Sequence, residues 1–170
     1  MDLGTFSKAD DGYRVRLERV YQHNINTVWD AITNPDKLKI WFTDFEIDFR
    51  VDGEMTIWFR DEARTPSYGK VVRIEPPHIF EWFWEDELAT FELSEVNSNS
   101  CRLTLTYTRI DKSYAAKVPA GFHLLLDQLE TVLDGRSEPY PFEGKETPEL
   151  AKLQAAYTAK LFPAYPELFN

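Results

Sequence analysis

The sequence predicts an α+β fold in which a curved antiparallel sheet of six to seven strands wraps around a long C-terminal helix. Residues 118–135 carry apolar side chains at three- and four-residue steps, which is the pattern of one long amphipathic helix. Most of the stretch before them alternates between polar and apolar side chains, as strands with one buried face do. We therefore expect the strands to share the apolar surface of a single helix.

The long helix organises the predicted fold. Pro119 suits the first turn of a helix, and Gly135 suits the position just past its end. The polar residues fall largely on the face opposite the apolar stripe; they are His123, Asp127, Gln128, Glu130 and Asp134. The apolar stripe itself consists of Val118, Phe122, Leu125, Leu126, Leu129, Val132 and Leu133.

The N-terminal part of the chain combines a flexible end, one strand and two short helices. Residues 1–12 are polar and acidic and are expected to be flexible, whereas residues 13–19 alternate and predict the first strand. Asn24 or Asn26 can cap a helix that ends before Pro35, because the residue before proline is pushed out of the helical region. Pro35 then begins a second short helix, and the pair should close one end of the curled sheet.

The remaining strands follow one another with short connections, which favours an antiparallel meander. Asp52-Gly53 is a strong hairpin signal between two of them. In the aromatic strand around residue 82, acidic side chains lie on the face opposite the tryptophans. This indicates that the tryptophan face points inward. We expect these strands over residues 45–51, 55–59, 68–75, 80–84, 89–93 and 101–107.

The C-terminal part contains a linker and a further helix. Residues 136–146 are rich in proline, glycine and charge, which predicts a surface linker. Residues 147–170 begin with a capping threonine and a proline and continue as a helix with an apolar tail. We expect this segment to pack on its own domain or on a partner subunit, as a lid over a pocket or as the contact of a homodimer.

Composition narrows the range of partners and compartments. The chain of 170 residues has a formal net charge of −10, which argues against nucleic acid and anionic membrane surfaces as partners. Cys101 is the single cysteine, so an internal disulfide is impossible and a reducing compartment fits. The N-terminus lacks the pattern of a signal peptide, and no apolar stretch approaches the roughly 20 residues of a membrane span. A cytoplasmic protein without integral membrane association is expected.

The order of these elements resembles the helix-grip, Bet v 1-like fold of the START-like (SRPBCC) superfamily. Local segments are similar to the branch named after the activator of heat-shock protein 90 ATPase, and the resemblance covers residues 13–135. The matching segments are Val28 to Thr33 with Pro35, Leu38 and Trp41-Phe42; Asp52-Gly53; Gly69 with Ile74 to Pro77; Phe80 to Trp84; Leu103 to Thr106; and Gly121-Phe122 with Leu126, Leu129 and Gly135.

A mismatch of widths predicts a hydrophobic cavity between sheet and helix. Six or seven strands about 4.8 Å apart span roughly 30 Å, whereas a helix is only about 10–12 Å across. The space between them must be filled by bulky side chains or by a ligand, and 15% of the chain is aromatic. The expected cavity-lining residues are Trp41, Phe45, Met55, Ile57, Trp82, Trp84, Phe91, Tyr107, Phe122 and Leu126.

Motifs for catalysis or metal binding are scarce. His23, His78 and His123 lack the spacing of metal ligands, so neither a metal site nor a cofactor is predicted. Cys101 has no motif that pairs it with a base and is interpreted as a buried structural thiol. Three charged strand residues could point into the cavity or lie on a solvated face: Arg73, Glu81 and Arg109.

The predicted function is binding of a small hydrophobic or amphipathic ligand without chemistry. The superfamily resemblance implies lipid-like, isoprenoid or polyketide-like compounds. One alternative is a cyclase- or aromatase-like enzyme on the same fold, which requires an ionisable group with a perturbed pKa in the pocket. The other is a protein-interaction or stress-related, co-chaperone-like module, which requires a closed cavity and an exposed apolar patch near Trp58 or on the tail.

Overall fold

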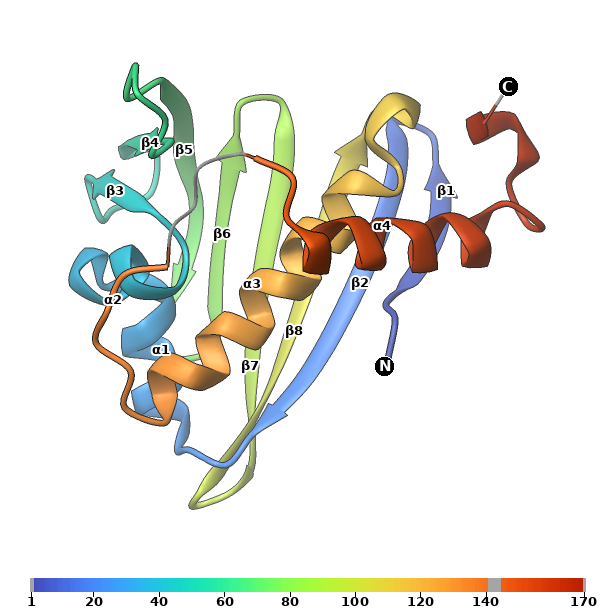
Figure 1. Ribbon diagram of the computed structural model, residues 1–170. Helices are drawn as coiled ribbons and strands as arrows, with labels where there is room; N and C mark the ends of the chain where they lie inside the picture. The colour runs from blue at the N-terminus through green and yellow to red at the C-terminus, as the bar shows by residue number, and fades with distance from the viewer. Residues whose placement is uncertain (1, 141–144, 170) are drawn as a thin grey trace.

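The computed structural model describes residues 2–140 and 145–169, in which eight strands form one antiparallel sheet in the order β1-β2-β8-β7-β6-β5-β4-β3 (Figure 1). The strands are β1 Thr5–Ala9, β2 Gly12–Tyr21, β3 Asp44–Ile47, β4 Glu54–Trp58, β5 Pro66–Glu75, β6 Ile79–Trp84, β7 Glu87–Asn97 and β8 Ser100–Ile110. The helices are α1 Ile25–Thr33, α2 Pro35–Trp41, α3 Lys117–Leu133 and α4 Pro148–Leu161, with short 3-10 turns at Lys112–Tyr114 and Pro166–Phe169. The predicted α+β fold with a gripped helix is confirmed.

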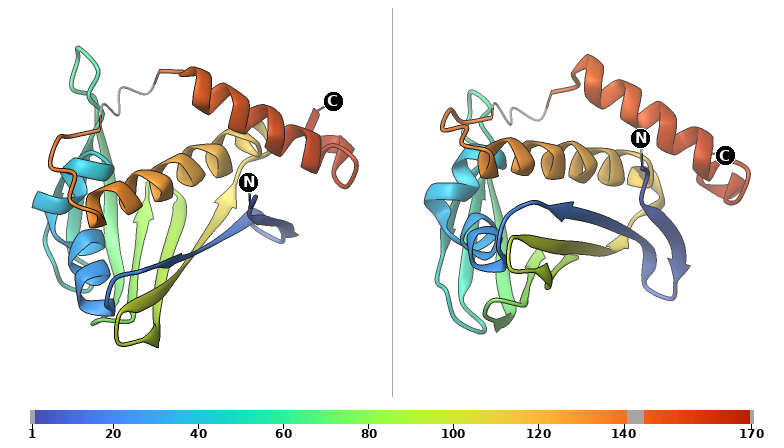
Figure 2. Two further views of the ribbon diagram at one scale, coloured as in Figure 1. Left: turned by 60° about the horizontal axis from the view of Figure 1, so that its bottom comes forward. Right: turned by 90° about the horizontal axis from the view of Figure 1, so that it is seen from below.

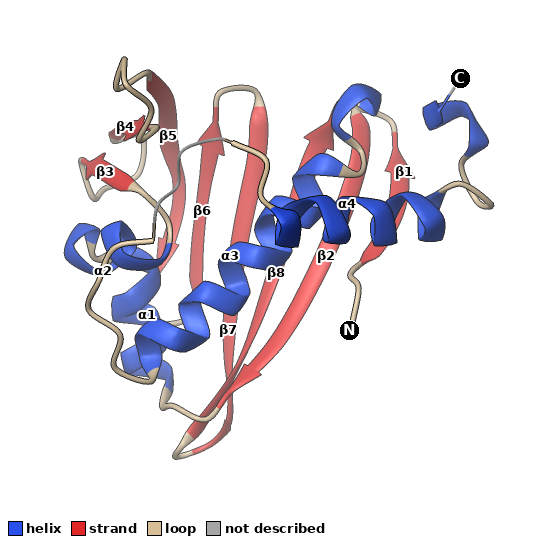
Figure 3. Cartoon of the chain, viewed as in Figure 1, coloured by secondary structure: helices blue, strands red, loops and turns tan. Residues whose placement is uncertain are grey.

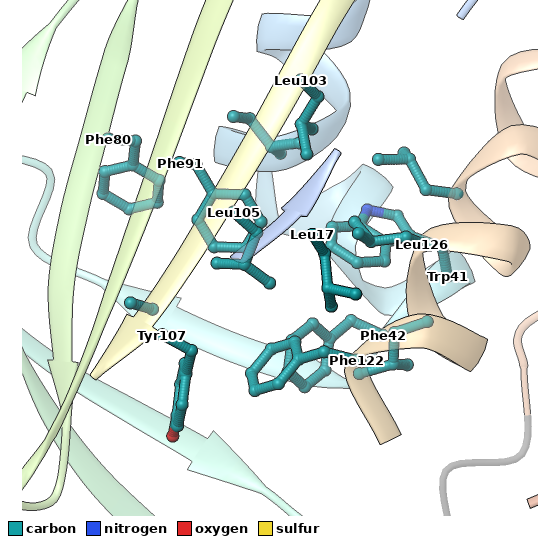
Figure 4. Packing of buried hydrophobic residues seen from close by; sticks show 14 of the residues in the cluster. Leu17, Trp41, Phe42, Phe80, Phe91, Leu103, Leu105, Tyr107, Phe122 and Leu126 are labelled. Carbon is teal, nitrogen blue, oxygen red and sulfur yellow. The ribbon is translucent and has the colours of Figure 1, made fainter. Parts of the chain in front are cut away.

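Three of the helices position the core relative to the sheet. The sheet curves, α3 crosses its concave face, and α1 and α2 close one end (Figure 2). The Tyr21 hydroxyl of β2 donates to the carbonyl of Leu126 at 2.9 Å and thereby ties the sheet to α3. Phe42 and Phe122 lie side by side, with ring centroids 6.1 Å apart, between the helices and the sheet (Figure 4).

The two short helices begin and end where the sequence indicates. The Asn24 side chain accepts from the Thr27 amide at 2.9 Å, which caps α1. Asn34 accepts from the Asp36 amide and caps α2, so Pro35 occupies the first turn. The buried Trp41 indole donates to the carbonyl of Ala31 at 2.8 Å and fixes the angle between α1 and α2.

The expectation of a flexible N-terminus over residues 1–12 is wrong for residues 5–9, which form β1 and pair with β2. Phe6 stacks on Tyr13 at 5.3 Å between ring centroids and meets the Tyr165 ring edge-on at 5.4 Å. The aromatic surface that stabilises β1 therefore comes partly from the C-terminal segment. This strand also brings the sheet to eight strands, one more than the upper estimate.

The strand predicted over residues 45–51 is shorter than expected. β3 ends at Ile47, and the side chains of Phe49 and Val51 are 45% and 55% exposed. A β-carbon on Gly53 would lie 1.8 Å from the carbonyl oxygen of Asp48, so only glycine fits this turn. The connection between β3 and β4 is longer than a two-residue hairpin loop, and its backbone is closely packed.

The C-terminal segment packs on its own domain, against α3 and the N-terminal strand (Figure 3). The Tyr157 hydroxyl accepts from the Gly4 amide at 3.1 Å, and Lys160 donates to the carbonyl of Gly4 at 2.7 Å. Of the predicted linker 136–146, residues 141–144 lie outside the described part of the chain. Its first residues contact α2, because the Tyr140 amide donates to the carbonyl of Ile40 at 2.8 Å.

Candidate functional site

An open pocket of about 300 Å³ lies where the N-terminal half of α3 faces the ends of β6, β7 and β8. Apolar side chains make up most of its wall, which is typical of sites for small organic ligands. Its lining residues are Phe59, Trp84, Glu85, Glu87, Tyr107, Lys117, Val118, Gly121, Phe122 and Leu125.

Gly121 keeps the pocket open on the side of α3. It lies inside the helix, where glycine costs roughly 0.5–1 kcal/mol of stability relative to alanine. A β-carbon built on Gly121 meets no heavy atom within 4 Å, so no close packing of the backbone explains the glycine. The space that a larger side chain would occupy is part of the pocket.

Four aromatic rings form the wall, and they meet at several angles. Phe59 and Trp84 stack with ring centroids 6.1 Å apart, while Trp84 and Phe122 meet edge-on at 6.4 Å. Tyr107 and Phe122 are closer, at 4.5 Å. The pocket wall therefore contains aromatic rings that pack against one another in several orientations.

Glu87 brings a carboxyl group into this apolar wall. The Tyr107 hydroxyl donates a hydrogen bond to it, and the Glu87 Oε2 atom is buried without a hydrogen-bond partner among the described residues. Burial raises the pKa of Glu87 to about 7, with smaller contributions from Asp86 and Asp111. Burial also raises the pKa of Tyr107, so its phenol stays protonated.

Trp84 is held in place by a chain of hydrogen bonds behind the pocket wall. Its indole donates to Ser67 Oγ at 2.7 Å, and Ser67 donates to Glu85 Oε1 at 3.0 Å. The same Glu85 oxygen accepts from the Tyr68 amide at 2.8 Å. Trp84 is thus oriented by β5 and by the turn that leads into β7.

A second, larger hollow of about 660 Å³ lies between β2, α3 and α4, and seven of its ten lining residues are polar or charged. His123 is buried beside it, with Nδ1 3.0 Å from the Tyr157 hydroxyl and Nε2 3.7 Å from Asp127. Burial lowers the pKa of His123, which favours the neutral ring, and a neutral Nδ1 can accept the Tyr157 proton. The residues at this hollow connect α4 to the domain.

The comparisons with known proteins settle the family. The family of Activator of Hsp90 ATPase homolog 1-like proteins matches residues 22–134, about two thirds of the chain. The chain belongs to this family. A comparison with curated proteins found no match.

This Activator of Hsp90 ATPase homolog 1-like chain also resembles solved structures, and the similarity reaches beyond the residues that the family matches. A conserved protein of unknown function from Enterococcus faecalis has a TM-score of 0.75 and 21% identity, covering 98% of this chain and 92% of its own. CalU16 from Micromonospora echinospora has a TM-score of 0.70 and 21% identity, covering 92% and 95%. A protein from Bordetella parapertussis has a TM-score of 0.68 and 26% identity, covering 87% and 86%. The START-like fold is therefore shown.

The expected cavity residues divide into two groups in this family member. Trp84, Tyr107 and Phe122 line the 300 Å³ pocket. The others are buried in the core and do not line it: Trp41, Phe45, Met55, Ile57, Trp82, Phe91 and Leu126. Helices α1 and α2 close the far end of the grip (Figure 2), whereas the 300 Å³ pocket lies near the start of α3.

Seven of the ten residues that line the pocket are not among the expected cavity residues, and Glu87 and Gly121 are the two on which its chemistry and volume depend. Glu87 lies between the strands predicted over residues 80–84 and 89–93, but it is the first residue of β7 and shares the inward face with Ala89 and Phe91. Extending the alternation of that strand by one step would have found it. Gly121 was noted only as part of a resemblance. The charged strand residues Arg73, Glu81 and Arg109 do not line the pocket.

The face of α3 that carries His123 is also not the solvent-exposed face that the sequence indicates. His123 is 5% exposed, because α4 covers this side of α3. A polar side chain is tolerated there because Tyr157 provides it with a hydrogen-bond partner.

Metal binding and cysteine chemistry have no structural support within the described residues. No group of three or more metal-binding side chains comes together in residues 2–140 and 145–169. Cys101 is buried as expected, and burial raises the pKa of its thiol to about 11, so it stays protonated. In the same part of the chain, no helix has the length and apolar character needed to cross a membrane.

Proposed function

We propose that this protein binds a small hydrophobic or amphipathic molecule of the lipid-like, isoprenoid or polyketide-like kind in the 300 Å³ pocket, without transforming it. The observation that carries this proposal is Gly121, a destabilising residue inside α3 whose missing side chain opens the pocket. The volume is at the lower end of the range of about 300–1,000 Å³ that is usual for ligand sites. A cytoplasmic location remains our expectation for it.

Filling the pocket from α3 is expected to weaken ligand binding. Gly121→Leu places a branched side chain into the open volume, and we expect at least about a tenfold loss of affinity for octanol, measured by calorimetry. Gly121→Ala is the matched control, because it adds one methyl group and should keep binding while raising stability by about 0.5–1 kcal/mol. Equal octanol binding by the wild type and Gly121→Leu would contradict the proposal.

A second candidate is an enzyme of the cyclase or aromatase kind, and Glu87 is the observation that favours it. A carboxyl with a pKa of about 7 beside a phenol can take and return a proton at neutral pH. If this holds, the wild type should accelerate hydrogen–deuterium exchange next to the carbonyl of bound methyl hexyl ketone, followed by NMR. Glu87→Gln should not. Equal exchange with and without protein would rule out this candidate for simple ketones.

The structure gives less support to a protein-interaction module. That reading requires a closed cavity, whereas the pocket is open. It also requires an apolar patch near Trp58 or on the tail, and Trp58 is partly buried. Among the described residues, the large exposed hydrophobic side chains are Val20, Phe49, Val51, Tyr68, Val96, Tyr114, Phe162 and Phe169. Only Phe162 and Phe169 lie on the tail, where their ring centroids are 5.7 Å apart.

A further inference from the structure

We propose that the ligand of the 300 Å³ pocket carries an ammonium group, so that the site takes an amphipathic amine with its hydrocarbon part on the aromatic wall and its cationic end at Glu87. This inference rests on the proposed function and specifies the ligand class. It is carried by the aromatic walls, an unsatisfied carboxylate oxygen and the charge around the pocket.

The aromatic walls suit a cation as well as a hydrocarbon chain. Phe59 and Trp84 stack on each other, and Tyr107 and Phe122 pack against each other. The negative faces of such rings attract an ammonium group within about 6 Å of the ring centroid. Rings at several angles also offer contacts to an alkyl chain, so one small pocket can hold both parts of an amine.

Glu87 provides a hydrogen-bond acceptor that the protein itself does not use. Oε2 has no partner among the described residues, and the Tyr107 hydroxyl interacts with the carboxyl group. A buried acceptor without a partner costs about 1–3 kcal/mol. An ammonium N–H that approaches the Glu87 carboxylate from the pocket would form a charge-assisted hydrogen bond with it.

The charges around Glu87 favour a cation over an anion. Glu85 lines the pocket, and Asp86 and Asp111 raise the pKa of Glu87 through space. Lys117 is the only cationic residue among the ten that line the pocket, and it is exposed on the first turn of α3. A carboxylate ligand would meet this acidic cluster, and a neutral ligand would leave Glu87 ionised and unpaired above pH 7.

The test compares three ligands with the same chain and different ends: octylammonium, octanol and octanoate. In calorimetry at pH 8, we expect the wild type to bind octylammonium at least about tenfold more tightly than octanol, and octanoate most weakly. Glu87→Gln should lose most of the preference for octylammonium while still binding octanol. Glu95→Gln is the matched control, because it removes the same charge from an exposed position on the same strand and should keep the preference.

The pH dependence gives an independent readout. Alkylamines stay protonated well above neutrality, as lysine does with its pKa of about 10.4, so Glu87 is the group that changes. The affinity of the wild type for octylammonium should rise as pH increases through 7 and level off above it, whereas that of Glu87→Gln should stay flat. Octanol affinity should not rise with pH in either protein.

The outcomes separate the two proposals. Equal binding of all three ligands, or tightest binding of octanol, overturns the ammonium proposal and leaves the pocket as a general hydrophobic site. Binding of octylammonium that Glu87→Gln leaves unchanged also overturns it. If no ligand binds the wild type, both proposals fail together.

Discussion

A chain that ends before residue 147 should lose about 4 kcal/mol or more of its free energy of unfolding, measured by urea denaturation. Leu153, Tyr157 and Leu161 are buried in the intact protein, and burial of each such side chain contributes about 1.5–3 kcal/mol. The truncation also removes the hydrogen-bond partner of the Gly4 amide and of His123. Because domains of this size are typically stable by about 5–15 kcal/mol, the truncated chain should be marginally folded.

A shorter truncation is the control for this result. Ending the chain after Tyr165 keeps α4 and the contact of Tyr165 with Phe6, so it should change stability far less. If the long truncation unfolded at the same urea concentration as the intact protein, α4 would not be part of the folded domain. Sedimentation of both chains also tests the homodimer proposed through residues 147–170, which predicts a halved mass only for the longer deletion.

Glu87→Gln should stabilise the protein at pH 8 by about 1–2 kcal/mol and leave it unchanged at pH 4. The folded-state pKa of Glu87, about 7, lies above its ordinary value of 4.5, so folding favours the protonated carboxyl. Stability from this group is present below pH 4.5 and is lost as pH rises through 7. The amide resembles the protonated acid in shape, so it avoids this loss, and partial contact with water limits the size of the gain.

The measurement is urea denaturation at several pH values between 4 and 8. Wild type and Glu87→Gln should coincide at the acidic end and separate as pH rises. Glu95→Gln, an exposed acid on the same strand, should follow the wild type throughout. Parallel curves for the wild type and Glu87→Gln would show that this carboxyl titrates as it does in water.

Local signals were sufficient to predict the helices and the grip. The side chains of Asn24 and Asn34 cap the two short helices. Pro35 restricts the backbone of the residue before it. The stripe of α3 has a period that only a helix can bury on one side. These features depend on neighbours in the sequence, which is why they can be read from it.

Features that depend on distant segments could not be predicted in the same way. β1 is stabilised by Tyr165, and His123 is buried by α4, more than thirty residues further along the chain. The position of the pocket depends on how far α1 and α2 fill the grip, so seven aromatic and aliphatic residues expected at the cavity lie in the core instead. Glu87 belongs to a run of acidic residues whose orientation is decided only by the pairing of β6 with β7.

The most direct test of the account is an NMR titration of the wild type with octylammonium, in which the indole N–H signals are followed. Trp84 lines the pocket that Gly121 leaves open, whereas Trp41 is buried in the core. The account predicts a saturable shift of the Trp84 signal, no shift of the Trp41 signal, and no Trp84 shift in Gly121→Leu. A Trp84 signal that does not move in the wild type, or that moves equally in Gly121→Leu, would contradict it.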